Sequence, residues 1–144
     1  MAAVCDIVIS ADDAIYGFTE VKLGIIPAVI SPFVLDKIGA SHARALFLTG
    51  ERFGAERARH IGLIHEIVPA GVLDAAVDAR LAELHSAGPL AVAAAKLLVR
   101  RVLDNSYDDT RSITSQAIAR QRAGAEGQEG LRAFLERRRA KFAE

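Results

Sequence analysis

The chain has 144 residues, of which 51% are hydrophobic and 25% are charged. This composition is that of a globular protein with a real core, and it excludes a disordered tail. Basic and acidic side chains balance at 18 each, which gives no electrostatic reason to expect nucleic acid or an acidic membrane as a partner. The single cysteine, Cys5, cannot form an intrachain disulfide, so we expect a cytoplasmic protein.

The first ordered element is predicted almost at the start of the chain. Residues 5–10 (CDIVIS) form an apolar, β-branched run that predicts an inner strand with Cys5 buried. Residues 63–68 (LIHEIV) are the other good strand candidate. Because a two-stranded sheet is marginal in water, we expect further strands from sequence before Met1 or from another chain. No run approaches the ~20 apolar residues that span a bilayer.

Helices are predicted for most of the remaining chain, from caps, glycine and proline breaks, and apolar stripes. The predicted ranges are residues 31–38, 41–49, 54–61, 70–86, 90–103, 107–122 and 128–142. Within residues 70–86, one stripe predicts either core or an oligomer interface; its members are Leu73, Val77, Leu81 and Leu84. His42, His60, His65 and His85 have no metal-ligand spacing with Cys5, so no metal site is expected.

Glu20 is the residue that most suggests chemistry. It lies between apolar neighbours in residues 16–27 (YGFTEVKLGIIP), shortly before Gly24 and Pro27. Burying an unpaired charge is costly, and a carboxylate in apolar surroundings is suited to proton transfer near neutral pH. On local composition alone, a carboxylate on the surface in the first turn of a helix is the plainer alternative.

Three segments, in this order, resemble the crotonase (enoyl-CoA hydratase/isomerase) superfamily. They are residues 5–10 with 16–27, residues 48–58 (LTGERFGAERA) with 61–69 (IGLIHEIVP), and residues 129–139 (EGLRAFLERRR). The resemblance covers the chain end to end, but only about the C-terminal half of a crotonase fold. It implies an α/β fold in two regions. Residues 1–69 would be the last part of a ββα spiral with the catalytic-glutamate loop, and residues 70–144 a mainly helical oligomerisation region.

The resemblance also implies an activity and its residues. Glu20 would be the catalytic acid/base of a hydratase-like lyase that adds water to a 2-enoyl-CoA thioester through a stabilised enolate. Phe134 and Arg137 would contact coenzyme A, although a solvated helix face is the plainer interpretation of Arg137. Pro27 and Phe33 would line an acyl pocket, with core packing as the alternative for Phe33. No cofactor is expected, since coenzyme A is part of the substrate.

In the family, the oxyanion donors and any second carboxylate precede the segment that matches Met1. We therefore expect a truncated chain that is inactive in isolation, and a homo-oligomer, either a trimer or a dimer of trimers. Residues 27–34 (PAVISPFV) resemble the branch of methylglutaconyl-CoA-type hydratases, which suggests fatty acid or branched-chain amino acid catabolism. An enoyl-CoA isomerase or other enolate-forming crotonase stays open, as does a helical oligomerisation fragment without catalytic activity.

Overall fold

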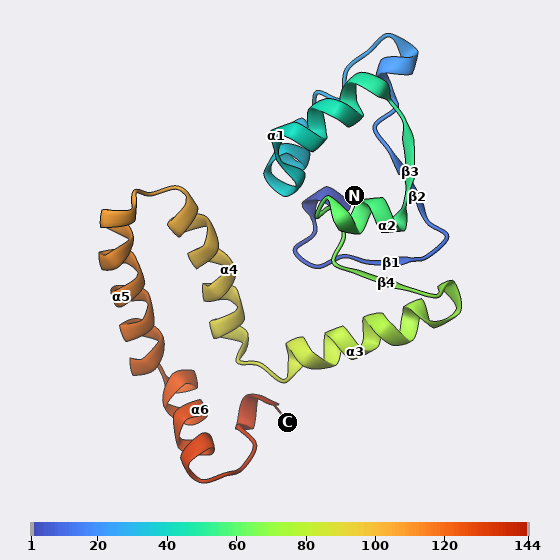
Figure 1. Ribbon diagram of the computed structural model, residues 1–144. Coiled ribbons are helices and arrows are strands. Elements are labelled where there is room, and N and C mark those ends of the chain that lie inside the picture. Colours follow the sequence, from blue (N-terminus) through green and yellow to red (C-terminus); the bar gives the residue numbers. More distant parts are fainter. Residues whose placement is uncertain (1, 144) are drawn as a thin grey trace. The chain divides into compact units, whose positions relative to one another are not determined.

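Two short strand pairs form the β part of the computed structural model, which describes residues 2–143 (Figure 1). β1 (Ile9–Ala11) runs parallel to β4 (Glu66–Val68), with Ser10 opposite Ile67. β2 (Ile15–Gly17) runs antiparallel to β3 (Arg52–Gly54), with Tyr16 opposite Phe53. The Tyr16 hydroxyl donates to Oγ of the buried Ser10 at 2.7 Å, which ties the two pairs together.

The strands differ from those that the sequence predicts. Of residues 5–10, only the last two join β1, because the chain bends at residues 6–7 after the short 3₁₀ turn η1 (Ala2–Val4). The prediction that Cys5 is buried is wrong: Cys5 is exposed, and its carbonyl accepts a hydrogen bond from Lys37 Nζ. β2 and β3 were not predicted, since three residues are too few to show an alternating pattern.

The helices follow the predicted breaks closely, except at the end of the chain. They are α1 (Ser31–Thr49), α2 (Ala55–His60), α3 (Leu73–His85), α4 (Pro89–Leu103), α5 (Tyr107–Ala123) and α6 (Ala125–Leu135). α1 joins two predicted helices across a kink at Gly39, where φ is 72°. The helix predicted over residues 128–142 is wrong at both ends, because α6 begins at Ala125 and stops at Leu135. The other 3₁₀ turns are η2 (Glu20–Leu23), η3 (Ala70–Val72) and η4 (Lys141–Ala143).

The chain divides after Asp78 into two compact units. The first unit holds most of the buried apolar side chains, which come from α1, β3, α2 and the turn before β4. The largest fully buried ones are Leu46, Ile64 and Val34. Aromatic rings link the residue after β2 to this core, since the Phe18 ring meets Phe47 edge-on at 5.3 Å between centroids. α1 also packs against η2, which brings the turn carrying Glu20 onto a rigid element.

The second unit consists of helices. α4 packs against α5, and α5 packs against α6 (Figure 1). Ala133 is buried, while several large apolar side chains on α4 are exposed, among them Leu90, Leu97, Val99 and Leu103. The stripe on α3 is also half-exposed, since Val77, Leu81 and Leu84 are 38%, 46% and 41% accessible. No helix within residues 2–143 has the length and apolarity needed to cross a membrane.

Candidate functional site

Glu20 is the first residue of η2, directly after the segment that leaves β2. The turn is closed by three backbone hydrogen bonds: Lys22 N–H to Thr19 O at 3.0 Å, Gly24 N–H to Val21 O at 3.2 Å, and Ile25 N–H to Glu20 O at 3.3 Å. Gly24 ends the turn in the left-handed conformation, with φ of 72°. The backbone of Glu20 is therefore held by a local turn that packs on α1.

The Glu20 side chain is partly buried, and one of its oxygens is shielded from solvent. Oε2 has no hydrogen-bond partner among the described residues. A buried polar atom without a partner costs free energy, so native proteins seldom keep one without a reason. A carboxylate oxygen in this condition is available to accept a proton from a ligand or to deliver one.

The residues predicted to line an acyl pocket follow Glu20 along the chain. Pro27 is buried, and its carbonyl accepts the Ser31 N–H at 3.1 Å, while Phe33 in the first turn of α1 is 48% exposed. A hollow of about 120 Å³ lies in the same unit, but other residues line it: Ala2, Ala3, Tyr16, Gly17, Phe18, Ile30 and Leu63. The acyl-pocket role of Pro27 and Phe33 therefore stays a prediction.

The residues predicted to contact coenzyme A lie at the end of α6, in the helical unit. Phe134 is 80% exposed. Arg137 is also exposed but lies beyond the helix, in the left-handed conformation with φ of 54°. Among residues 2–143, Arg137 makes no ion pair, so its guanidinium and the Phe134 ring are both open to a ligand. Their contact with coenzyme A stays a prediction.

The neighbouring Arg138 forms ion pairs, and its main partner, Glu129, was not predicted from the sequence. Its guanidinium donates to both oxygens of Glu129, at 2.7 Å and 3.2 Å, and to Glu136 at 2.6 Å. The hydrogen bond from Arg138, followed by that from the Lys141 N–H, lowers the pKa of Glu129 from 4.5 to about 2. The same bond raises the pKa of Arg138. The network folds the chain after α6 back onto that helix.

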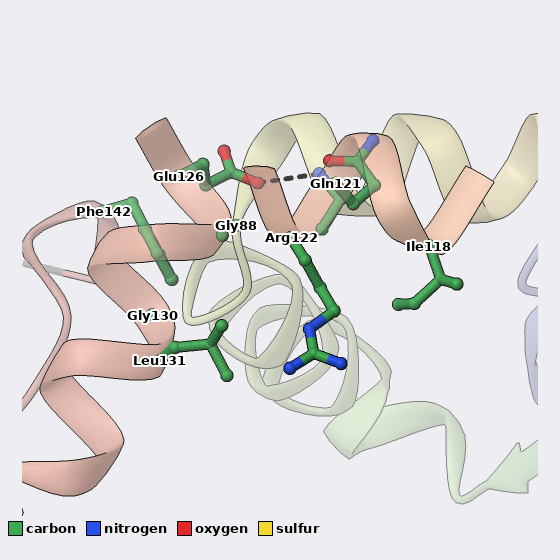
Figure 2. A pocket seen from close by; sticks show the side chains of 10 residues that line it. Gly88, Ile118, Gln121, Arg122, Glu126, Gly130, Leu131 and Phe142 are labelled. Atoms are coloured by element: carbon green, nitrogen blue, oxygen red, sulfur yellow. Dashed lines mark hydrogen bonds between the residues drawn. The ribbon is translucent and has the colours of Figure 1, made fainter. Parts of the chain in front are cut away.

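A second hollow, of about 220 Å³, lies in the helical unit between α4, α5 and α6 (Figure 2). Its wall is mostly apolar, with Ile118, Leu131 and Phe142. Its carboxylate, Glu126, is already engaged, because it accepts the Leu90 N–H at 3.0 Å and the Ala91 N–H at 2.8 Å. Glu126 thus caps the start of α4 from another helix, and a role in proton transfer would break that cap.

Within residues 2–143, no group of three or more His, Cys, Asp or Glu side chains is placed to hold a metal ion.

The sequence profile of the enoyl-CoA hydratase/isomerase family matches residues 1–144. The chain belongs to this family. The crotonase resemblance of the three sequence segments is therefore confirmed at the level of the family.

Relatives of this enoyl-CoA hydratase/isomerase family member support both the family and the fold. The crotonyl-CoA hydratase of Syntrophomonas wolfei is 32% identical over 143 residues, which are 99% of this chain and 55% of the relative. A solved enoyl-CoA hydratase from Shewanella pealeana is 41% identical with a TM-score of 0.90, over 97% of this chain and 52% of that structure.

An enoyl-CoA hydratase/isomerase from Marinobacter aquaeolei matches at 34% identity and a TM-score of 0.94, over 99% of this chain and 55% of that structure. These scores establish an α/β crotonase-like fold that is rich in helices and has few strands. The chain spans about half the length of the relatives that it matches.

Proposed function

We propose that this chain supplies the acid/base carboxylate of an enoyl-CoA hydratase, and that Glu20 is that carboxylate. The observation that carries the proposal is the buried Oε2 of Glu20, which has no hydrogen-bond partner among the described residues. Membership of the enoyl-CoA hydratase/isomerase family supports the reaction class. The surface alternative for Glu20 is disfavoured, since water would then satisfy both carboxylate oxygens.

Hydration adds the elements of water across the double bond of a 2-enoyl thioester. One proton reaches the carbon next to the thioester carbonyl, hydroxide adds to the next carbon, and an enolate forms in between. Glu20 would exchange the proton with water or with the substrate carbon. The enolate oxygen needs aimed hydrogen-bond donors, which are often the largest catalytic contribution. Glu20 is the residue of this chain to which we assign proton transfer.

The substrate would be held as an acyl-CoA thioester, without a further cofactor. The exposed Phe134 ring can stack on a flat base. Arg137, which makes no ion pair among residues 2–143, offers a guanidinium suited to phosphate. A homo-oligomer would cover exposed apolar side chains such as Leu97 and Leu103. Residues 27–34 resemble methylglutaconyl-CoA-type hydratases. The acyl group of the substrate can therefore be either straight or branched.

The test uses a chimera in which this chain replaces the matched 143 residues of the Syntrophomonas crotonyl-CoA hydratase. We expect Glu20→Gln to lower kcat for crotonyl-CoA by about 10²–10⁴-fold. Glu56→Gln makes the same chemical change at a side chain that is 79% exposed, and it should leave kcat unchanged. Near-parental turnover in Glu20→Gln would refute the assignment.

Two further arms separate the alternatives. A 3-enoyl-CoA substrate reports isomerisation, in which one carboxylate moves a proton between two carbons; preferential turnover of that substrate would favour an isomerase. The chain alone should be far less active than the chimera, because it spans about half of the relative. A non-catalytic oligomerisation role would be favoured by two results together. The chain alone would form a stable oligomer, and the chimera would show no turnover that depends on Glu20.

A further inference from the structure

Gly50 directly follows the last residue of α1 and lies against the turn that carries Glu20. Gly50 is buried, and its N–H donates to Leu46 O at 2.9 Å. A Cβ atom added to Gly50 would lie 2.9 Å from Val21 Cγ2 and 3.2 Å from both Cγ and Cε of Lys22. Carbon atoms pack at about 3.5–4.0 Å, so the position has no room for a side chain.

The contact with Val21 is the important one. The long Lys22 side chain is exposed and can rotate away, whereas Val21 is short, β-branched and partly buried. Val21 follows Glu20 in η2, and its carbonyl accepts the Gly24 N–H at 3.2 Å in the bond that closes the turn. Moving Val21 away from α1 would therefore move the backbone of Glu20.

We propose that Gly50 is a positioning residue for Glu20: the absence of a side chain at the end of α1 sets how closely η2 approaches that helix. The catalytic part of this inference rests on the proposed function of Glu20, whereas the structural part does not. The expected consequence is specific. A methyl group at residue 50 displaces the η2 turn, and removing Cγ2 of Val21 lets the turn return.

Gly50 has a second property that must be separated from its close packing. Its φ is 58°, and any other residue is strained there. Gly39 supplies the control, because it lies inside α1 with φ of 72° and ψ of 165° and has nothing within 4 Å of the position of an added Cβ. That conformation is less tolerant of a side chain than the one at Gly50, where φ is 58° and ψ is 28°. Gly39→Ala thus carries at least as much backbone strain without touching η2.

The first arm measures amide hydrogen exchange on the 144-residue chain. The amides of Gly24 and Ile25 close the turn, so Gly50→Ala should speed their exchange by about tenfold or more. Gly39→Ala should leave these two amides near the parental rate. The double variant Val21→Ala/Gly50→Ala should bring them back towards the rate in Val21→Ala. Equal exchange in Gly50→Ala and Gly39→Ala would overturn the inference.

The second arm measures turnover of crotonyl-CoA in the chimera. Gly50→Ala should lower kcat on the order of 10–100-fold with a smaller change in KM, because a displaced carboxylate still permits binding. Val21→Ala/Gly50→Ala should recover most of kcat, and Gly39→Ala should keep it. If Gly50→Ala does not fold, the double variant decides, since failure of both would show that packing on Val21 is not the cause.

The two arms distinguish the two proposals. A parental chimera without Glu20-dependent turnover would contradict the proposed function, while hydrogen exchange would still decide whether Gly50 positions η2. The parental chimera could instead turn over normally while Gly50→Ala and the double variant lose activity equally. That result would overturn the positioning role and leave the function of Glu20 standing.

Discussion

Glu129 and Arg138 form a two-pronged ion pair in which Nη1 lies 2.7 Å from Oε1 and Nη2 lies 3.2 Å from Oε2. The Glu129 side chain is 18% exposed, and the Lys141 N–H donates to the same Oε1 at 3.1 Å. These bonds join α6 to the segment that follows it, because Arg138 and Lys141 both lie beyond the end of the helix. The pair therefore fixes the path of the chain after Leu135.

The pair predicts a specific loss of stability in acid. The pKa of Glu129 is lowered from 4.5 to about 2, first by the Arg138 side chain and then by the Lys141 N–H. A lowered pKa in the folded state means that the stabilisation is fully present above pH 4.5 and is lost as the pH falls towards about 2. The difference in urea midpoint between the parental chain and Glu129→Gln should therefore shrink across this window. A difference that stays constant between about pH 6 and about pH 2.5 would contradict it.

The cap on α4 predicts the effect of removing Glu126. Glu126→Ala leaves the N–H groups of Leu90 and Ala91 without their carboxylate, which should cost about 1 kcal/mol, as for the loss of other helix caps. Glu126→Gln keeps one acceptor oxygen and should cost less. Urea unfolding measures both. Asp104→Asn is the control, because its pair with Arg100 is exposed and 3.4 Å long. Equal stability of Glu126→Ala and Asp104→Asn would show that the cap contributes little.

A hydrogen bond to the His65 side chain gives a third stability prediction, at the start of the parallel strand pair. The imidazole Nδ1 of His65 accepts the Val8 N–H at 3.0 Å, and the backbone N–H of His65 donates to Val8 O at 2.9 Å. His65→Ala should cost about 1 kcal/mol and speed exchange of the Val8 amide. His65→Asn places an oxygen close to the position of Nδ1 and should retain most of the protection. Slow exchange of the Val8 amide in His65→Ala would show that the imidazole is not what protects it.

The helices could be predicted from the sequence because their signals are local. Pro32, Gly39 and Gly50 mark the start, the kink and the end of α1 within single turns. The end of α6 could not be predicted in this way. The apolar and basic pattern continues past Leu135, but the chain leaves the helix and Arg138 pairs with Glu129 instead. That competing contact depends on side-chain geometry that periodicity does not encode.

The strands and the candidate site show the same limit. β2 and β3 bring Tyr16 opposite Phe53. This pairing joins residues far apart in the sequence, and strands of three residues are too short to show a pattern that predicts it. Glu20 could be proposed from its apolar neighbours and from the family resemblance. Two features required coordinates: the buried Oε2, which has no hydrogen-bond partner among residues 2–143, and the close approach of Gly50 to Val21. Gly50 carried a sequence signal only as the end of a helix.

Two glycines in α6 give opposite predictions for the same substitution. A Cβ on Gly127 would collide with the backbone carbonyl of Gln121, where neither group can rotate away, so Gly127→Ala should cost about 1–3 kcal/mol. A Cβ on Gly130 would meet only the Phe142 ring, at 3.4 Å, which is close to ordinary contact. Since alanine favours a helix over glycine by up to about 1 kcal/mol, Gly130→Ala should be neutral or stabilising.

Thermal and urea unfolding of the two variants, measured side by side, check this pair of predictions. Both substitutions add one methyl group to the same helix, so differences in helix propensity cancel between them. What remains is the contact with the end of α5 at Gln121. Equal effects of Gly127→Ala and Gly130→Ala would mean that α6 can move away from α5 without cost, and that the close approach of these two helices does not stabilise the helical unit.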